Sequence, residues 1–132
     1  MRVGVTATQE GLTDRQRFLV RDQLIALNCT ELHHGDCIGG DAEIHEIAWD
    51  MGIAIVIHPP IKTNKRAFCR GAILVHEPYD YLVRNRHIVD ATEFLIGCPN
   101  TRKEKLRSGT WSTLRYARKM GKPLIVLGPY PN

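Results

Sequence analysis

The chain has 132 residues, of which 43% are hydrophobic and 24% charged, and its formal net charge is +4. This length suits a single domain, 1–132, and the composition is that of a soluble globular protein. No apolar run approaches the ~18 residues of a membrane helix, and the N-terminus has no signal-peptide core. We therefore expect a cytoplasmic protein with no membrane partner. Its four widely spaced cysteines predict free thiols rather than a disulfide framework.

The first half of the chain alternates strands with helices. A β-branched run predicts a buried strand over residues 2–6, and a capping box that begins at Thr13 predicts a helix of about 14 residues. Residues 31–34 form a short, poorly marked strand. Apolar residues at i, i+3, i+4 and i+7 then predict a helix that ends at Gly52. The nearly continuous apolar run 53–58 predicts a strand covered on both faces.

The connection over residues 59–78 has no clear period and carries four cations: Lys62, Lys65, Arg66 and Arg70. A connection of this length is uncommon in a compact domain and is often functional. A solvated loop with a short extra strand at 72–75 explains the same pattern. Both interpretations remain open at this point.

The second half repeats the alternation. Asp80 is placed to cap a helix that runs to about Ala91, and residues 93–97 form a strand. A polar, basic loop over 98–108 leads into a helix over 110–120. Residues 123–127 form the last strand. The expected inward face of the 110–120 helix consists of Trp111, Leu114, Ala117 and Met120.

This order of elements predicts an α/β fold. We expect a Rossmann-like three-layer α/β/α sandwich with a five-stranded, mainly parallel sheet of order 3-2-1-4-5, numbered along the chain. In such sheets, ligands bind beyond the carboxyl ends of the strands, near the point where the strand order reverses. The candidate site therefore lies in the loops that follow the strands.

Small, polar and glycine-rich segments follow three of the predicted strands, at residues 6–9, 35–41 and 108–110. Each leads into a helix, and a helix N-terminus offers unpaired N–H groups to a phosphate or carboxylate. No segment matches the GxGxxG or GxxxxGK[ST] patterns. The glycines either form tight turns or let the backbone approach an anion. Two glycine loops at one edge of one sheet favour the anion site.

The segment GDCIGGDAEIHEIAWDMGI resembles the stretch G-x-x-x-G-A-D-x-x-A-x-x-W-A-x-x-x-G-I of the SLOG superfamily. This Rossmann-like group includes DNA-processing protein A and the Lonely Guy cytokinin-activating enzymes. The resemblance continues through Arg84 and Asn85, the SGT segment 108–110 and the GKP segment 121–123, and covers nearly the whole chain. It implies a protein that binds a nucleotide or nucleotide-derived small molecule and forms homo-oligomers.

The resemblance also implies which residues contact the ligand. Gly39, Gly40 and Asp41 would line one side of the pocket, Arg84 and Asn85 would approach from the long connection, and Ser108, Gly109 and Thr110 would hold phosphate. Asp41 would also cap the helix that follows it. Position after a strand adds Thr6 and Gly35 to the predicted ligand-binding residues.

Three functions remain open. The first is binding of a nucleotide-derived ligand, such as an ADP-ribose derivative, as a sensor or scavenger. The second is hydrolysis of a nucleotide N-glycosidic bond, although the glutamate that Lonely Guy enzymes carry after GT is absent from WSTLR. That chemistry requires a carboxylate, so Asp41 or Glu43 would be catalytic. The third is single-stranded DNA binding through a basic loop without interleaved aromatic residues; its cations are Arg102, Lys103, Lys105 and Arg107.

The remaining reactive side chains give no strong pattern. His33 and His34 are adjacent and point to opposite faces of a strand, and no histidine pair has metal-ligand spacing on a helix. We therefore expect no metal and no cofactor, and we place His45 at the surface or the pocket edge. Cys37 lies near a helix N-terminus, where a thiol becomes reactive, but a passive, buried thiol is the alternative we favour.

Overall fold

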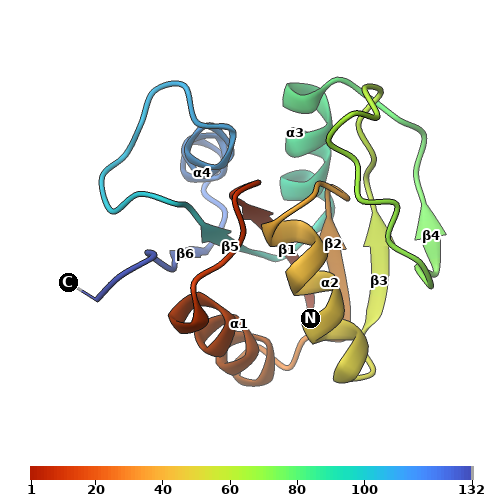
Figure 1. The fold of residues 1–132 in the computed structure, drawn as a ribbon, viewed down its shortest axis with the longest axis horizontal. Helices are drawn as coiled ribbons and strands as arrows, with labels where there is room; N and C mark the ends of the chain where they lie inside the picture. Colours follow the sequence, from red (N-terminus) through yellow and green to blue (C-terminus); the bar gives the residue numbers. More distant parts are fainter. Residues whose placement is uncertain (132) are drawn as a thin grey trace.

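The computed structural model describes residues 1–131, which form one parallel sheet between two pairs of helices (Figure 1). The elements alternate as the sequence predicts. In chain order they are β1 (Arg2–Ala7), α1 (Asp14–Ala26), β2 (Glu31–His34), α2 (Gly40–Asp50), β3 (Ala54–Ile57), β4 (Leu74–Val75), α3 (Tyr81–Ala91), β5 (Phe94–Cys98), α4 (Gly109–Lys119) and β6 (Leu124–Val126).

The sheet has six strands in the order β4-β3-β2-β1-β5-β6, and all neighbours are parallel. Without β4, this is the predicted order 3-2-1-4-5. The expectation of five strands is wrong, because the short extra strand of the alternative interpretation forms at the edge. Both residues of β4 are exposed, so no alternation of buried and exposed positions marks this strand in the sequence.

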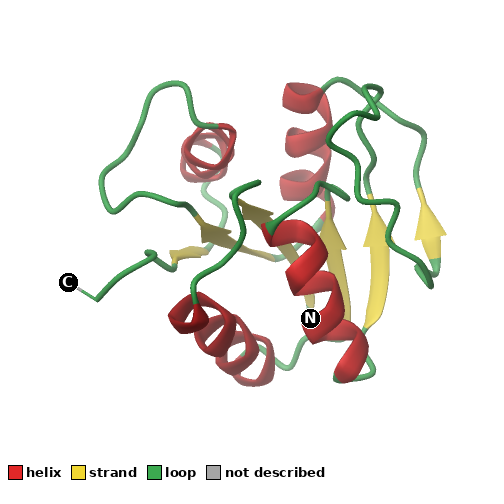
Figure 2. Cartoon of the chain, in the orientation of Figure 1, coloured by secondary structure: helices red, strands yellow, loops and turns green. Residues whose placement is uncertain are grey.

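Helices cover both faces of the sheet (Figure 2). One core cluster, which includes Val20, Leu24, Ile44 and Ala48, packs α1 and α2 on one face. The other packs Ile88 and Val89 of α3 with three inward residues of α4; these are Trp111, Leu114 and Ala117. The predicted α4 face is wrong only at Met120, which follows the last helical residue and is 56% exposed.

The start of α1 ties together two distant segments of the chain. The predicted capping box is present, with the Thr13 side chain and the Gln16 side chain each bonded to the other's backbone N–H. Gln16 is fully buried, and its amide nitrogen donates to the carbonyls of Pro99 (2.8 Å) and Leu127 (2.9 Å). It therefore fixes where the loop after β5 begins.

All four cysteines are free thiols, as predicted, and Cys37 and Cys98 are buried. None of the helices within residues 1–131 is long and apolar enough to cross a membrane. Burial raises the pKa of the Cys37 thiol, which donates to the carbonyl of Gly35. Cys37 is therefore protonated at neutral pH, which favours the passive role.

Candidate functional site

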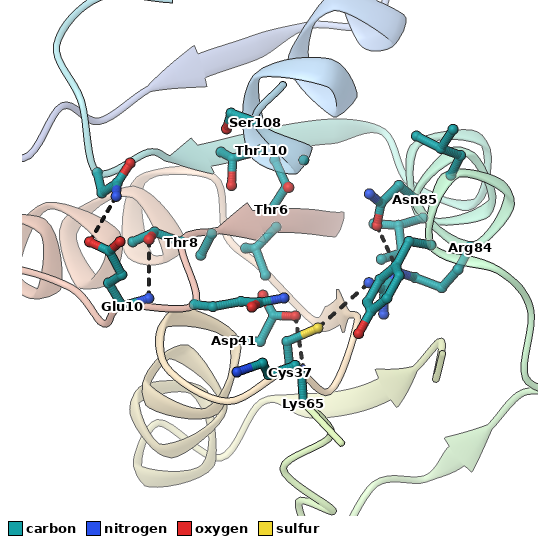
Figure 3. Close-up of a pocket in the computed structure, with 18 of the residues that line it drawn as sticks. Thr6, Thr8, Glu10, Cys37, Asp41, Lys65, Arg84, Asn85, Ser108 and Thr110 are labelled. Carbon is teal, nitrogen blue, oxygen red and sulfur yellow. Dashed lines mark hydrogen bonds between the residues drawn. The ribbon is translucent and has the colours of Figure 1, made fainter. Parts of the chain in front are cut away.

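A cavity of about 750 Å³ opens at the carboxyl edge of the sheet, where the strand order reverses between β1 and β5 (Figure 3). Its walls come from the end of β1, the starts of α2, α3 and α4, and the loops 59–73 and 99–108. Seven of the ten residues predicted to bind a ligand line it: Thr6, Asp41, Arg84, Asn85, Ser108, Gly109 and Thr110.

The N-terminus of α4 presents unpaired donors to this cavity. Ser108 is the N-cap, and its hydroxyl accepts from the N–H of Trp111 at 3.2 Å. The N–H groups of Gly109 and Thr110 have no partner within residues 1–131. The Thr110 side chain is only 7% exposed, yet its hydroxyl makes no bond to the described chain and faces the cavity (Figure 3). This arrangement suits a phosphate.

Asp41 sits in the floor of the cavity and is 5% exposed. Its Oδ2 accepts from the backbone N–H groups of Gly35 (3.1 Å) and Cys37 (3.3 Å). Its Oδ1 has no hydrogen-bond partner within the described chain. Every described side-chain oxygen that is shielded from solvent does have a partner, so Oδ1 is accessible from the cavity. Thr6, which is also buried, lines the cavity as well. The floor therefore offers a free acceptor to a ligand.

Burial raises the pKa of Asp41 to about 6. The buried cation of Arg84 and the N–H groups of Cys37 and Gly35 oppose this rise, because they stabilise the carboxylate. The carboxyl group therefore gains or loses a proton close to neutral pH. A carboxyl with this property is able to act as a general acid or base.

Arg84 lines the cavity, but its guanidinium is bonded to the protein. It donates to the carbonyls of Gly35 and His58, to the Asn85 side-chain oxygen and to the Cys37 sulfur. Arg84 therefore holds the ends of β2 and β3 together and places a positive charge beside Asp41. The side-chain nitrogen of Asn85 has no partner within residues 1–131 and remains available to a ligand.

Of the four glycines predicted to contact the ligand, Gly109 lines the cavity, and Gly35, Gly39 and Gly40 do not. A Cβ on Gly35 would lie 2.3 Å from Arg84 Nη1, and one on Gly40 would lie 2.4 Å from the Ala7 Cβ. Gly39 has a φ of +82°, and its Cβ would lie 2.1 Å from the Gln9 carbonyl oxygen. Gly39 and Gly40 therefore allow the start of α2 to pack against the end of β1 and the loop after it, and Gly35 leaves room for the Arg84 guanidinium.

Replacing Gly40 with alanine should destabilise the fold by about 1–3 kcal/mol, because the new methyl group overlaps packed atoms. The matched control is Gly109→Ala, since a Cβ there meets no atom within 4 Å and Gly109 also begins a helix. Urea unfolding measures both variants. Equal stability of the two would contradict the close packing at Gly40.

Of the two catalytic candidates, only Asp41 lies in the cavity. Glu43 points to the opposite side of α2, where its Oε2 accepts from the N–H of Leu12 at 2.7 Å. Its Oε1 forms an ion pair with Arg17 at 3.0 Å. Glu43 therefore fastens α2 to α1 and does not reach a ligand in this cavity.

Asp36 is a residue whose importance the sequence does not reveal. Its fully buried carboxylate accepts from Arg66 Nε (2.8 Å) and the Cys69 N–H (2.9 Å), and its carbonyl accepts from the Ala67 N–H (2.7 Å). Asp36 has a φ of +58°, a conformation in which Asp is enriched. It fixes the loop 59–73 beside the cavity.

The cavity is strongly electropositive. Its lining includes two acidic residues, Glu10 and Asp41, against five cations: Lys62, Lys65, Arg84, Lys105 and Arg107. None of these five cations forms an ion pair within the described chain. A cleft lined by one sign of charge concentrates ligands of the opposite sign.

A buried histidine chain lies behind the cavity. The Asp36 N–H donates to His34 Nδ1 (2.9 Å), so His34 Nε2 carries the proton and donates to His45 Nδ1 (2.9 Å). His45 Nε2 then donates to the Arg70 carbonyl (2.8 Å). His45 is 2% exposed and does not line the cavity, so it lies neither at the surface nor at the pocket edge, the two positions expected for it.

The atoms of His34, His45 and Cys69 that would ligate a metal lie within 4.8 Å of one another. To bind a metal, His34 Nε2 would have to lose its proton, and the neutral imidazole would then carry its proton on Nδ1. That proton would point at the Asp36 N–H, so the hydrogen bond between them would be lost. Burial also raises the pKa of Cys69 to about 12, which disfavours the thiolate. The hydrogen bonds of this cluster therefore favour the metal-free form.

No family model and no curated protein matches this chain. Among solved structures, it is similar to the molybdenum cofactor binding protein of Rippkaea orientalis, with a TM-score of 0.73 and 22% identity over 96% of this chain and 76% of that one. DNA processing protein A of Helicobacter pylori gives a TM-score of 0.67 and 21% identity, covering 100% of this chain and 67% of that one.

DNA processing protein A of Streptococcus pneumoniae gives a TM-score of 0.65 and 17% identity over 95% of this chain, which spans about half (49%) of that protein. At these identities the similarity shows the fold alone. The Rossmann-like fold that the resemblance implies is confirmed, since this chain is similar in fold to the DNA processing proteins.

Proposed function

We propose that this protein binds a nucleotide or nucleotide-derived small molecule, with a phosphate at the N-terminus of α4. The observation that carries the proposal is the set of unpaired donors at Gly109 and Thr110, facing an electropositive cavity. The similar protein from Rippkaea orientalis is described as binding a molybdenum cofactor, so this fold accommodates a small ligand in at least one protein.

The rest of the cavity suits the non-phosphate part of such a ligand. Its volume, about 750 Å³, lies within the range typical of small-molecule sites. Tyr81, Leu82 and Ile88 supply apolar surface for a base. Asp41 Oδ1 and Thr6 supply acceptors for sugar hydroxyls. A protein with this site would act as a sensor or scavenger of its ligand.

A chromatographic panel tests the proposal directly. The purified protein is incubated with nucleoside monophosphates, NAD, ADP-ribose and cyclic dinucleotides, and each mixture is analysed before and after the protein is denatured. We expect one compound to be depleted by native protein and recovered intact after denaturation. Full recovery of every compound from the native protein would contradict nucleotide binding.

Asp41 favours hydrolysis of a nucleotide N-glycosidic bond as a second candidate function. It is a buried carboxyl group with one free oxygen in the cavity and a pKa of about 6. The same panel separates the two functions, because an enzyme releases free base over time. If base appears, Asp41→Asn is expected to abolish its release while leaving binding intact. Release by the variant at the wild-type rate would exclude Asp41 as the catalytic group.

Even without turnover, Asp41 should make binding of an anion dependent on pH. Its carboxyl group ionises near pH 6 and then repels a bound phosphate, so we expect wild-type affinity to fall roughly tenfold between pH 5 and 7. Asp41→Asn removes this repulsion. Calorimetric titration of both proteins isolates the contribution of Asp41, since titration of the ligand affects them equally. Identical pH profiles would place the phosphate far from Asp41.

Single-stranded DNA is the remaining ligand class. The Helicobacter pylori neighbour is described in terms of single-stranded DNA binding, and two cations of the basic loop, Lys105 and Arg107, line this cavity. An oligonucleotide in the panel should bind with a steep salt dependence if this is the function.

Self-association also stays a prediction, which light scattering coupled to size-exclusion chromatography checks.

A further inference from the structure

Two cationic loops stand on opposite sides of the cavity. The loop 99–108, after β5, contributes Lys105 and Arg107, and the loop 59–73, after β3, contributes Lys62 and Lys65. Figure 3 shows Lys65 across the cavity from Ser108 and Thr110. In the order β3-β2-β1-β5, the strands that carry these loops are three spacings apart, or about 14 Å. The cationic side chains of both walls line the cavity between them, so a ligand in the cavity can contact both walls.

The wall formed by the loop 59–73 is fixed rather than free. The Ile38 N–H donates to the Lys65 carbonyl at 2.9 Å, and Cys37 pairs with Arg66 in an antiparallel bridge. Asp36 holds the next turn of the loop through the Arg66 side chain and the Cys69 N–H. The backbone of Lys65 is therefore anchored to the loop that also carries the floor of the cavity.

Two lysines on this wall have no counter-ion within the described residues. Arg66 on the same loop is neutralised by Asp36 at 2.8 Å, whereas Lys62 and Lys65 form no ion pair within residues 1–131. The Glu10 carboxylate, which also lines the cavity, accepts a hydrogen bond from the Asn100 side chain at 2.8 Å and therefore lies beside the opposite loop, 99–108. A ligand with a single phosphate at α4 leaves the cations of the 59–73 wall unneutralised.

We infer that the ligand carries two separated phosphates: one binds at the start of α4, and the other binds between Lys62 and Lys65. The chemical class is a nucleotide phosphorylated on both sides of its sugar, as in a nucleoside 3′,5′-bisphosphate. The assignment of the first phosphate rests on the proposed function. The assignment of the second rests on the unpaired lysines of the anchored loop 59–73.

Calorimetric titration with the 5′-monophosphates and 3′,5′-bisphosphates of adenosine and guanosine, at fixed ionic strength, tests this inference. For at least one base, we expect the wild-type protein to bind the bisphosphate at least tenfold more tightly than the monophosphate. The double variant Lys62→Ala/Lys65→Ala should lose that advantage and keep its affinity for the monophosphate within threefold. The charge-matched control is Arg15→Ala/Arg21→Ala on α1, whose side chains are exposed outside the cavity; it should keep the advantage.

The other outcomes separate this inference from the proposed function. Equal affinity of the wild type for both forms overturns the second phosphate site and leaves the first intact. Equal weakening of both forms by the lysine variant also overturns it, since the lysines then act only through long-range attraction. Failure of every nucleotide to bind overturns both proposals. Affinity for phosphorylated oligonucleotides that rises steadily with length would assign the two walls to a nucleic-acid strand instead.

Discussion

Replacing Thr110 with aspartate is expected to reduce nucleotide affinity at least a hundredfold. The Thr110 side chain is 7% exposed and lies beside the unpaired N–H groups of α4. A carboxylate there would occupy the position of the phosphate and repel it within a partly desolvated cavity. Calorimetric titration with the tightest ligand of the panel measures the loss.

The fold should tolerate this change, because a negative charge in the first turn of a helix interacts favourably with the helix dipole. Ser112→Asp is the matched control: it adds the same charge near the start of α4 but lies outside the cavity. It should keep affinity within about fivefold, and Thr110→Val, which removes only the hydroxyl, should lose about five- to tenfold. If Thr110→Asp bound the ligand with unchanged affinity, the assignment of the phosphate to the start of α4 would be wrong.

Lowering the pH from 7 to 5 should destabilise the protein by about 3 kcal/mol. The pKa of both His34 and His58 is lowered to about 3. Burial is the largest cause for each, followed by the nearby His45 for His34 and the nearby His33 for His58. In the unfolded chain both histidines take up protons below about pH 6.5. The stability that depends on keeping a histidine neutral is fully present above about pH 6.5 and is lost as the pH falls below that value. At pH 5 this loss is about 2 kcal/mol per histidine.

Asp41 acts in the opposite direction. Its pKa is raised to about 6 in the folded protein, so its ionisation destabilises the fold at pH 7, and about 1 kcal/mol of stability returns by pH 5. The net loss is still a large share of the stability typical of a domain. Urea unfolding at pH 7, 6 and 5 measures it, and His58→Asn should remove about half of the histidine contribution. A free energy of unfolding that stays constant over this range would show that these histidines are not buried in neutral form.

Most of the fold follows from local sequence patterns. The apolar stripe of α2, the capping box of α1 and the continuous run of β3 each depend on neighbours in the sequence, and the helices and long strands form where these patterns predict. The edge strand Leu74–Val75 is different, because it has two residues and both are exposed. Only its pairing with β3 defines it, and no local pattern encodes that pairing.

The lining of the candidate site is predictable where it depends on strand ends and not where it depends on long-range contacts. Asp41 and Thr110 follow strands at the carboxyl edge, and both line the cavity. Gly39 and Gly40 pack against the end of β1 and the loop after it, and the guanidinium of Arg84 bonds to the backbone just after β2 and β3. Asp36 bonds to residues 30 or more positions away. None of these contacts is visible before the chain is folded.

The cavity combines a fixed floor with a charged rim, formed by Lys62, Lys65, Lys105 and Arg107. The floor and the rim should govern different stages of binding. Arg84 holds the floor and Asp36 holds the wall 59–73 by hydrogen bonds to backbone and side chains, so little of either has to be ordered when a ligand arrives. The cations of the rim attract anions from a distance. Added salt should therefore slow association markedly and change the lifetime of the complex less, because that lifetime is set by short contacts of the ligand with α4, with the floor and with Lys62 and Lys65.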